Sequence, residues 1–352
     1  RYDDDRYEVP ECIVIWGYNI PATCPDNVFG HWIIDLMKKG TEIICIDPRL
    51  TWFASRSKKW LPIRPGTDGA LALGFLNVIL NEGLYDREFV EQWTNAPFLV
   101  RRDSGKLLRG SDLVSEGCAD DFVVWDASRA KPVIWQSERA EYESAEVEPA
   151  LQGDFQVSLG DGQQVACKTV WDRFRERVDE YPVERVAEIT WVPAKDIAQA
   201  ARMYAKAKPA AIHWGVPIDM TPAITPTTQG IAALWCLTGN LDRPGGNVIS
   251  RYAFDAVAYA LPGAEGIIKL KSAEADKKRI GRDRYGPLRQ FIWRAHTDLV
   301  LDQIFSEDPY PINAMRIQTS NPLARIGLDP LKWREALKKL DFVTVDDQVM
   351  TP

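Results

Sequence analysis

The chain has 352 residues, of which 45% are hydrophobic and 26% are charged, and it carries a formal net charge of −7. This composition is ordinary for a globular protein, and the length is sufficient for two domains with a large core. The acidic balance argues against general affinity for nucleic acids, and the sequence contains no apolar run long enough to span a membrane.

The first part of the chain predicts a strand–helix–strand unit followed by a further helix. Two continuous apolar runs rich in β-branched residues are typical of buried parallel strands. Asp or Asn side chains can cap the helix between them, and Gly40 is the expected stop. The expected elements are strands 12–16 and 42–46 and helices 26–39 and 67–81.

From about residue 97 the pattern changes, and residues 97–168 predict a β-rich insertion with two short strand pairs. The α/β pattern then returns, with Pro193 suited to the first position of a helix. Residues 240–268 are expected to be a loop, and 269–294 a basic connector. The later expected elements are helix 193–207, strand 210–214, helix 227–238, strand 315–318, a helix beginning at Asp329–Pro330, and strand 342–345.

Alternating strands and helices predict an α/β fold of mostly parallel sheets with helices on both faces, similar to a Rossmann fold, with the β-rich insertion at about 97–168. We expect residues 1–250 to form this domain, and residues 251–352 to form a connector and the start of a second α/β domain. Ligands of such sheets bind at the carboxyl ends of the strands, where the loops of this chain are rich in Gly, Pro, Asn and Asp.

Two motifs at these loops are candidates for holding a nucleotide. Asp47 follows a strand directly and can accept hydrogen bonds from ribose or a base, while Arg49 can pair with a phosphate. The alternative is a turn-capping Asp beside a surface Arg. Gly66, Thr67 and Asp68 offer free amide groups at a helix start, although Asp68 could instead be only the helix cap.

Other catalytic and metal-binding patterns are absent from the sequence. The turn at Gly17 is neither a GxGxxG fingerprint nor a P-loop, which disfavours an ordinary dinucleotide fold. None of the six cysteines lies in a Cys-x-x-Cys pair. The histidines His31, His213 and His296 are scattered, and the first two fall inside an expected helix and strand. We therefore assign no catalytic residue and no metal ligand.

Seven motifs occur in the order seen in one family. They are Gly-Tyr-Asn-Ile-Pro-Ala-Thr-Cys-Pro (17–25), Ile-Asp-Pro-Arg (46–49), Arg-Pro-Gly-Thr-Asp-Gly-Ala-Leu-Ala-Leu (64–73), Trp-Gly-Val (214–216), Leu-Thr-Gly-Asn-Leu-Asp-Arg-Pro-Gly-Gly-Asn (237–247), Ser-Asn-Pro-Leu (320–323) and Leu-Asp-Phe-Val-Thr-Val-Asp-Asp (340–347). This series resembles the molybdopterin oxidoreductases of the dimethyl-sulfoxide reductase family, which bind molybdenum or tungsten through two pyranopterin guanine dinucleotides. The insertion is similar to a branch containing acetylene hydratase, transhydroxylase and catechol dehydroxylases.

The resemblance implies cofactor-binding roles for residues on the strand-end loops. Asp68 would recognise guanine, and Asp47 and Arg49 would meet the ribose and phosphate. One departure from the family pattern is Ile20, which separates Asn19 from the following proline. The complete implied set is Gly17, Tyr18, Asn19, Pro21, Asp47, Pro48, Arg49, Gly66, Thr67, Asp68, Trp214, Gly215, Asn247 and Asn321.

The resemblance also implies groups outside this chain. A 4Fe-4S cluster and the protein ligand of the metal would precede it, and a barrel domain holding the second dinucleotide would follow it. The full protein would act on a small-molecule substrate by oxo or hydroxyl transfer or by dehydroxylation, with an iron–sulfur electron-transfer subunit as partner. Two alternatives remain: a non-catalytic relative that serves as a structural or electron-transfer subunit, and a stand-alone nucleotide-binding protein.

Overall fold

The computed structural model describes residues 7–23, 28–114, 117–221, 223–249, 274, 277–284, 297–326, 329–347 and 349–350. The chain divides into two compact units, Arg1–Ile249 and Ser250–Pro352. Most of the predicted loop 240–268 and of the basic connector 269–294 lies outside the described residues, as does the predicted helix start at 26–27.

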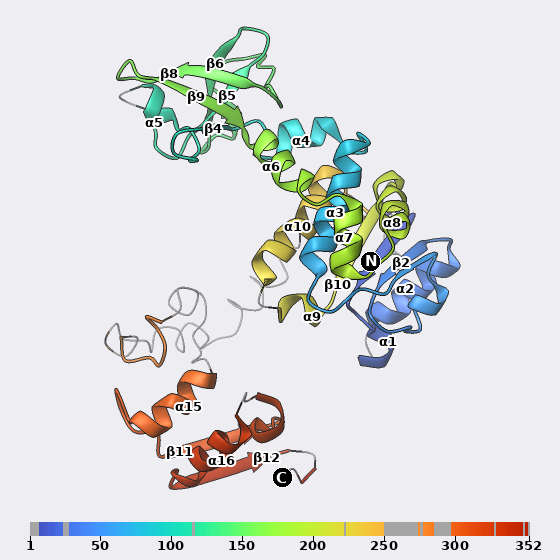
Figure 1. The fold of residues 1–352 in the computed structure, drawn as a ribbon, viewed down its shortest axis with the longest axis vertical. Coiled ribbons are helices and arrows are strands. Elements are labelled where there is room, and N and C mark those ends of the chain that lie inside the picture. Colours follow the sequence, from blue (N-terminus) through green and yellow to red (C-terminus); the bar gives the residue numbers. More distant parts are fainter. Residues whose placement is uncertain are drawn as a thin grey trace. The chain divides into compact units, whose positions relative to one another are not determined.

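The first unit is built on a parallel sheet of four strands in the order β10-β1-β2-β3 (Figure 1). Every residue of β1 is buried, as expected for the central strand of a sheet covered on both faces. The strands predicted at 12–16, 42–46 and 210–214 are confirmed, and β3 was not predicted. The strands are β1 (Cys12–Trp16), β2 (Glu42–Ile46), β3 (Lys59–Leu61) and β10 (Ala210–Trp214).

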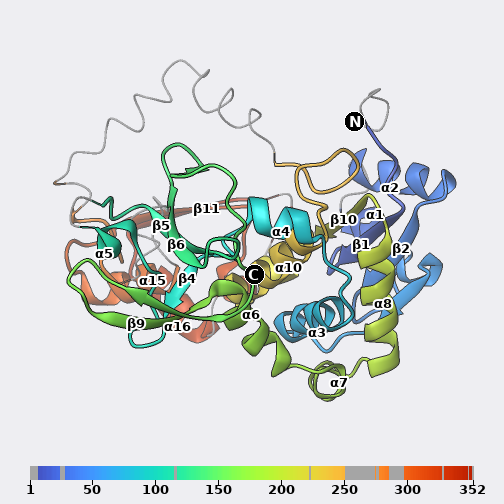
Figure 2. The same cartoon turned by 90° about the horizontal axis from the view of Figure 1, so that it is seen from above.

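Helices cover both faces of this sheet, because side chains of successive strand residues point to opposite sides. Ile13 and Ile15 pack into a cluster with residues of α2, whereas Val14 and Trp16 join the larger core formed with α3, α7, α8 and α10. Figure 2 shows α2 and α3 on opposite sides of the strands. The helices are α1 (Ile20–Thr23), α2 (Val28–Lys38), α3 (Asp68–Asn81), α4 (Arg87–Trp93), α6 (Val170–Asp179), α7 (Val183–Thr190), α8 (Ala194–Lys206), α9 (Val216–Asp219) and α10 (Ile224–Leu237), with a 3-10 turn η1 (Ala54–Arg56).

Two predicted helix boundaries and the predicted loop after β10 need correction. Pro193 is the N-cap of α8 and not its first residue, because its backbone is outside the helical region. Helix α10 begins at Ile224, three residues before the predicted start. The stretch after Gly215, predicted to be a loop, contains the short helix α9, which has a proline in its first turn.

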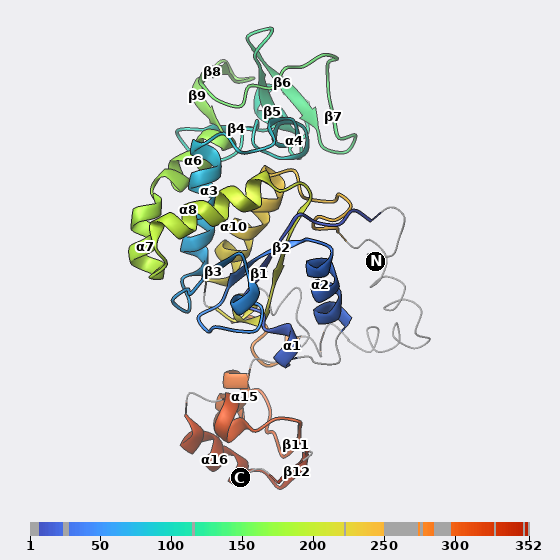
Figure 3. The ribbon, with the colours of Figure 1, turned by 90° about the vertical axis from the view of Figure 1, so that its right-hand side faces the viewer.

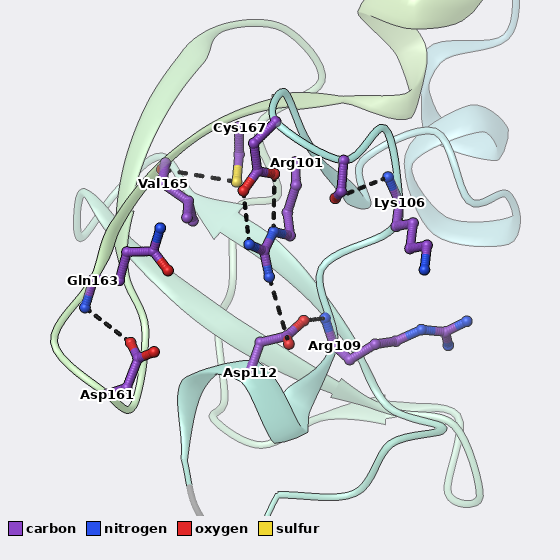
Figure 4. A network of polar contacts seen from close by, with 10 residues as sticks. Arg101, Lys106, Arg109, Asp112, Asp161, Gln163, Val165 and Cys167 are labelled. Carbon is purple, nitrogen blue, oxygen red and sulfur yellow. Dashed lines mark hydrogen bonds and ion pairs between the residues drawn. The ribbon is translucent and has the colours of Figure 1, made fainter.

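The predicted β-rich insertion consists of two antiparallel sheets, with strand orders β4-β9-β8 and β5-β6-β7. The predicted hairpin at its start is reduced, since Val100 pairs with Leu107 only through an isolated bridge. A polar network closes this turn: Arg101 bonds Asp103, and Asp112 accepts from the Arg109 amide (Figure 4). The elements are β4 (Leu99–Arg101), α5 (Gly110–Leu113), β5 (Phe122–Asp126), β6 (Lys131–Gln136), β7 (Glu141–Tyr142), β8 (Asp154–Ser158) and β9 (Gln164–Thr169).

The second unit has a small α/β arrangement in which two parallel strands pack with two helices around Trp333. Asp329 caps its second helix by accepting a hydrogen bond from the Lys332 amide at 3.0 Å, with Pro330 at the first position as predicted. The elements are α15 (Thr297–Ser306), β11 (Ala314–Gln318), a π-helical turn η2 (Pro322–Ile326), α16 (Pro330–Lys338) and β12 (Phe342–Asp346).

A fully buried carboxylate, Asp126, organises one end of the insertion. It accepts hydrogen bonds from the amide and hydroxyl of Ser128 at 3.0 and 2.7 Å, and it pairs with Arg129 at 3.1 Å. The hydrogen bonds from Ser128 hold the pKa of the Asp126 carboxyl below its usual range. The ionised carboxylate therefore stabilises the folded insertion.

We predict that Asp126→Asn lowers the thermal unfolding midpoint of the insertion at neutral pH. Because the folded-state pKa is lowered, the stability from ionised Asp126 is present above the unfolded pKa and is lost as pH falls through the folded one. The difference in unfolding midpoint between wild type and variant should therefore disappear at acidic pH. Melting curves over a pH series measure this, with exposed Asp120→Asn as the control; a gap that does not depend on pH would contradict the prediction.

Candidate functional site

The register of the parallel sheet brings three strand ends to one level. Trp16 of β1 pairs with Trp214 of β10 on one side and with Ile46 of β2 on the other. The next residues are therefore neighbours: the Gly17 amide donates to the Ile46 carbonyl at 2.7 Å, and the Gly215 amide donates to the Trp16 carbonyl at 3.0 Å. Gly17, Asp47 and Gly215 thus lie along a single edge, where α/β sheets bind ligands.

Two glycines make this close arrangement possible. Gly17 has a φ of +61°, a left-handed conformation that disfavours other residues. A Cβ atom on Gly215 would meet the Gly17 carbonyl oxygen well inside contact distance and would lie 2.9 Å from Cβ of Tyr18. The loops after β1 and β10 can therefore touch only if position 215 has no side chain.

A pocket of about 450 Å³ opens at this edge, a volume within the range of about 300–1,000 Å³ typical of small-molecule sites. Eight residues of the predicted set line it. They are Gly17, Tyr18, Asn19, Asp47, Pro48, Arg49, Gly66 and Asp68. The sequence predicted these residues on separate loops, and the structure brings them together.

Asp47 serves the turn that contains it and also faces the pocket. Its side chain is only 7% exposed, and Oδ1 accepts a hydrogen bond from the Arg49 amide at 2.8 Å. Its backbone carbonyl accepts from the Trp60 indole at 2.8 Å, which fixes the loop to β3. The Arg49 side chain is exposed and makes no ion pair with the described residues, so its guanidinium is available for a phosphate.

Asp68 is the most distinctive group in the pocket. It is the first residue of α3, and its Oδ1 accepts a hydrogen bond from the indole nitrogen of fully buried Trp16 at 2.8 Å. Burial raises the pKa of the Asp68 carboxyl, and the bond from Trp16 offsets part of this effect. Asp68 is not the helix cap, because Thr67 occupies that position and makes no capping bond with its side chain.

The first loop continues into the short helix α1. The Asn19 carbonyl accepts hydrogen bonds from the amides of Ala22 and Thr23 at 3.1 and 3.0 Å. Ile20, the departure from the family pattern, is fully buried in the cluster on the α2 face. Its side chain anchors the turn, while Pro21 lines a separate hollow of about 420 Å³ together with Asn19.

Six predicted residues do not line this pocket: Asn321, which belongs to the second unit, and Pro21, Thr67, Trp214, Gly215 and Asn247 of the first. Trp214 stacks on Trp235 with ring centroids 5.2 Å apart. Asn247 bonds both backbone groups of Ile212, at 2.8 and 2.9 Å, and so completes the outer edge of β10. Its observed role is structural.

Asn321 belongs to the second unit, where its Oδ1 accepts a hydrogen bond from the Ala324 amide at 3.2 Å.

Seven residues that line the pocket were not predicted from the sequence. The Gly-Val-Pro sequence at 215–217 is a local signal for a helix start, because proline suits the first turn of a helix. Pro65 belongs to the motif at 64–73. The additional lining residues are Thr23, Ile46, Ile63, Pro65, Val216, Pro217 and Thr221.

The pocket has the groups needed to hold a nucleotide. Gly66 has a φ of +82°, and a Cβ there would meet no atom within 4 Å, so the loop leaves open space at the helix start. Asp68 retains its second carboxylate oxygen without a side-chain donor among the described residues. These features fit a ligand with N–H donors at one end and phosphates at the other.

A family model described as "Molybdopterin oxidoreductase" matches residues 5–299. The chain belongs to this family. It is 30% identical over 344 residues to perchlorate reductase subunit alpha of Dechloromonas aromatica, covering 90% of this chain and 36% of that protein. It is 28% identical over 423 aligned positions to dopamine dehydroxylase of Eggerthella lenta, covering 95% of this chain and 40% of that protein. The family uses a molybdenum or tungsten pterin cofactor.

The fold is also that of a solved member of the family. Acetylene hydratase from Pelobacter acetylenicus superposes with a TM-score of 0.60 and 24% identity, covering 98% of this chain and 40% of that chain. The predicted α/β fold is therefore confirmed. The chain spans less than half the length of these relatives.

The described residues contain no group of three or more His, Cys, Asp or Glu side chains that could hold a metal ion. Among the same residues, no helix is both long and apolar enough to cross a membrane.

We predict that Gly215→Ala destabilises the first unit more than Gly66→Ala does. The methyl group at 215 overlaps the backbone of the Gly17 loop, which cannot move aside as a flexible side chain can, so the cost lies at or above the upper end of the about 1–3 kcal/mol typical of overpacking. At 66 the methyl group meets open space, so the cost is only the backbone strain of about 1–2 kcal/mol. Thermal melts of the two variants measure which one is less stable. An equal loss of stability in both, or a larger loss in Gly66→Ala, would contradict the close contact between Gly215 and the Gly17 loop.

Proposed function

We propose that the pocket at the sheet edge holds the guanine-dinucleotide end of the molybdenum or tungsten pterin cofactor. The observation that carries this proposal is Asp68, a partly buried carboxylate fixed by Trp16 at 2.8 Å and exposed to a pocket of nucleotide size. A carboxylate with a raised pKa is costly for the empty fold, because burial disfavours its charge. A ligand with two N–H donors would compensate that cost.

Guanine has the required donor pattern. Its Watson–Crick edge presents N1–H and the exocyclic N2–H side by side, and both can donate to one carboxylate. Adenine presents an unprotonated N1 at the corresponding position and would face the carboxylate with a lone pair. Asp68 therefore favours guanine over adenine at this position.

The remaining lining residues would hold the sugar and phosphates. Asp47 has one oxygen committed to the Arg49 amide and a second available for a ribose hydroxyl. Arg49 can contact a phosphate through its guanidinium, which makes no ion pair with the described residues, and the open backbone at Gly66 lets a ligand approach the start of α3. Gly17, Tyr18 and Asn19 would line the pyrophosphate turn.

In the full-length protein, the metal would supply the chemistry on a small-molecule substrate, namely oxo or hydroxyl transfer or dehydroxylation. The share of this chain is to bind and orient the cofactor. The names of relatives that include a perchlorate reductase subunit and a dopamine dehydroxylase support this class of reaction. We further propose a 4Fe-4S cluster and a second dinucleotide site in the parts of the protein outside this chain, and an iron–sulfur subunit as the electron-transfer partner.

Asp68→Asn tests the guanine contact in the full-length protein. The amide can still accept from Trp16 but presents N–H groups to the N–H groups of guanine, so retention of the dinucleotide should weaken by about 1–3 kcal/mol. Because the folded pKa of Asp68 is raised, its ionisation costs stability at neutral pH, and the cofactor-free variant should be at least as stable as wild type.

The measurements are metal content, pterin and released guanine nucleotide after purification, together with the melting temperature of the cofactor-free protein. Exposed Asp179→Asn is the matched control, since it removes a carboxylate outside the pocket. Unchanged nucleotide content in Asp68→Asn would refute the contact. Absence of metal and pterin from the wild-type protein would instead support a non-catalytic structural relative.

A further inference from the structure

A further hollow lies in the first unit, on the β-rich insertion and away from the strand ends of the parallel sheet. It has a volume of about 900 Å³ and shares no lining residue with the nucleotide pocket. Helix α4 forms one wall, and β6, β7 and the segment after β7 form the others. Figure 3 shows α4 beneath the β5-β6-β7 sheet.

Four aromatic side chains line this hollow: Trp93, Phe98, Trp135 and Tyr142. Trp135 and Tyr142 meet edge to face, with ring centroids 4.8 Å apart and an interplanar angle of 73°. Phe98 is held by stacking on Phe122 at 4.5 Å. Trp93, the last residue of α4, is 75% exposed at the rim. The faces of such rings carry negative electrostatic potential and attract cations.

The charged groups of the hollow leave one uncompensated carboxylate. Arg87 and Glu91 neutralise each other, with Nε and Oε1 2.6 Å apart along α4. Glu148 lines the same hollow, is exposed and makes no ion pair with the described residues. The balance of the lining residues is therefore one negative charge.

The wall that carries Glu148 is fixed by backbone bonds to β5. The Glu148 carbonyl accepts from the Ala127 amide at 2.8 Å, and the Ala150 amide donates to the Trp125 carbonyl at 2.8 Å. The Glu148 amide also lies 3.4 Å from the buried Asp126 carboxylate. The backbone at Glu148 is thus fixed before any ligand arrives, which reduces the entropy cost of binding.

We propose that this hollow binds a small organic cation, in which an ammonium group is attached to an apolar or aromatic body. The ammonium would lie against the aromatic faces near Glu148, and the body would fill the space between α4 and β7. Anionic ligands are disfavoured, because the one cation among the described lining residues, Arg87, is already paired. Tyr142 would act through its neutral ring, since burial and the nearby Glu91 raise the pKa of its phenol to about 12.

Binding can be measured by ¹⁹F NMR on the full-length protein labelled with 5-fluorotryptophan, with the Trp93 signal assigned through Trp93→Phe. The probe is benzyltrimethylammonium, compared with neutral benzyl alcohol and anionic benzoate. The cation should shift the Trp93 signal and bind about 3- to 30-fold more tightly than the alcohol, the range expected of a cation–π contact. Benzoate should bind more weakly than the alcohol.

Glu148→Gln should weaken the cation and leave benzyl alcohol unchanged, whereas Glu88→Gln, which removes an exposed carboxylate of α4 outside the hollow, should change neither. The other tryptophan signals report whether each variant is folded. Equal affinity for cation and alcohol, or equal effects of the two variants, would overturn the proposal. A Trp93 signal without a solvent isotope shift would also overturn it, since another part of the protein would then fill the hollow.

Discussion

The in-register pairing of β10, β1 and β2 is the constraint on which the site depends. Because Trp16 lies opposite both Trp214 and Ile46, the residues that follow all three emerge at the same edge. That edge is crowded, and the contact between the loops after β1 and β10 requires glycine at 215. A slip of one residue in either pairing would separate the loops and exchange the side chains between the two covered faces of the sheet, so the hydrophobic core and the pocket are specified by the same register.

At this edge the pocket contains the Asp68 carboxylate, whose partial burial disfavours its charged form in the absence of a ligand. Asp68 joins the end of β1 to the start of α3 through Trp16, yet burial raises its pKa. Such an arrangement gives little stability by itself and is best explained by a ligand. Asp126 in the insertion shows the opposite case, since hydrogen bonds lower its pKa and its charge supports the fold.

The sequence alone predicted the central strands and the loops at their ends, because continuous apolar runs and Gly- or Asp-bearing turns are local signals. It missed β3, which has only three residues, and the four-residue helices α1, α5 and α9. It also missed the longer helices α4, α6, α7 and α15. The bond between Trp16 and Asp68 spans 52 positions and depends on how α3 packs on the sheet. The amide of Asn247 bonds both backbone groups of Ile212 at the edge of β10, a contact that no local pattern reveals.

The central claim is that Asp68 reads the guanine of a pterin dinucleotide at the edge formed by Gly17, Asp47 and Gly215. A structure of the full-length protein purified with its cofactor tests this most directly. The account predicts the base with N1–H and N2–H within hydrogen-bond distance of Asp68, Oδ1 still bound to Trp16, and the phosphates near Arg49. Metal and pterin present with the nucleotide elsewhere, and this pocket empty, would contradict it.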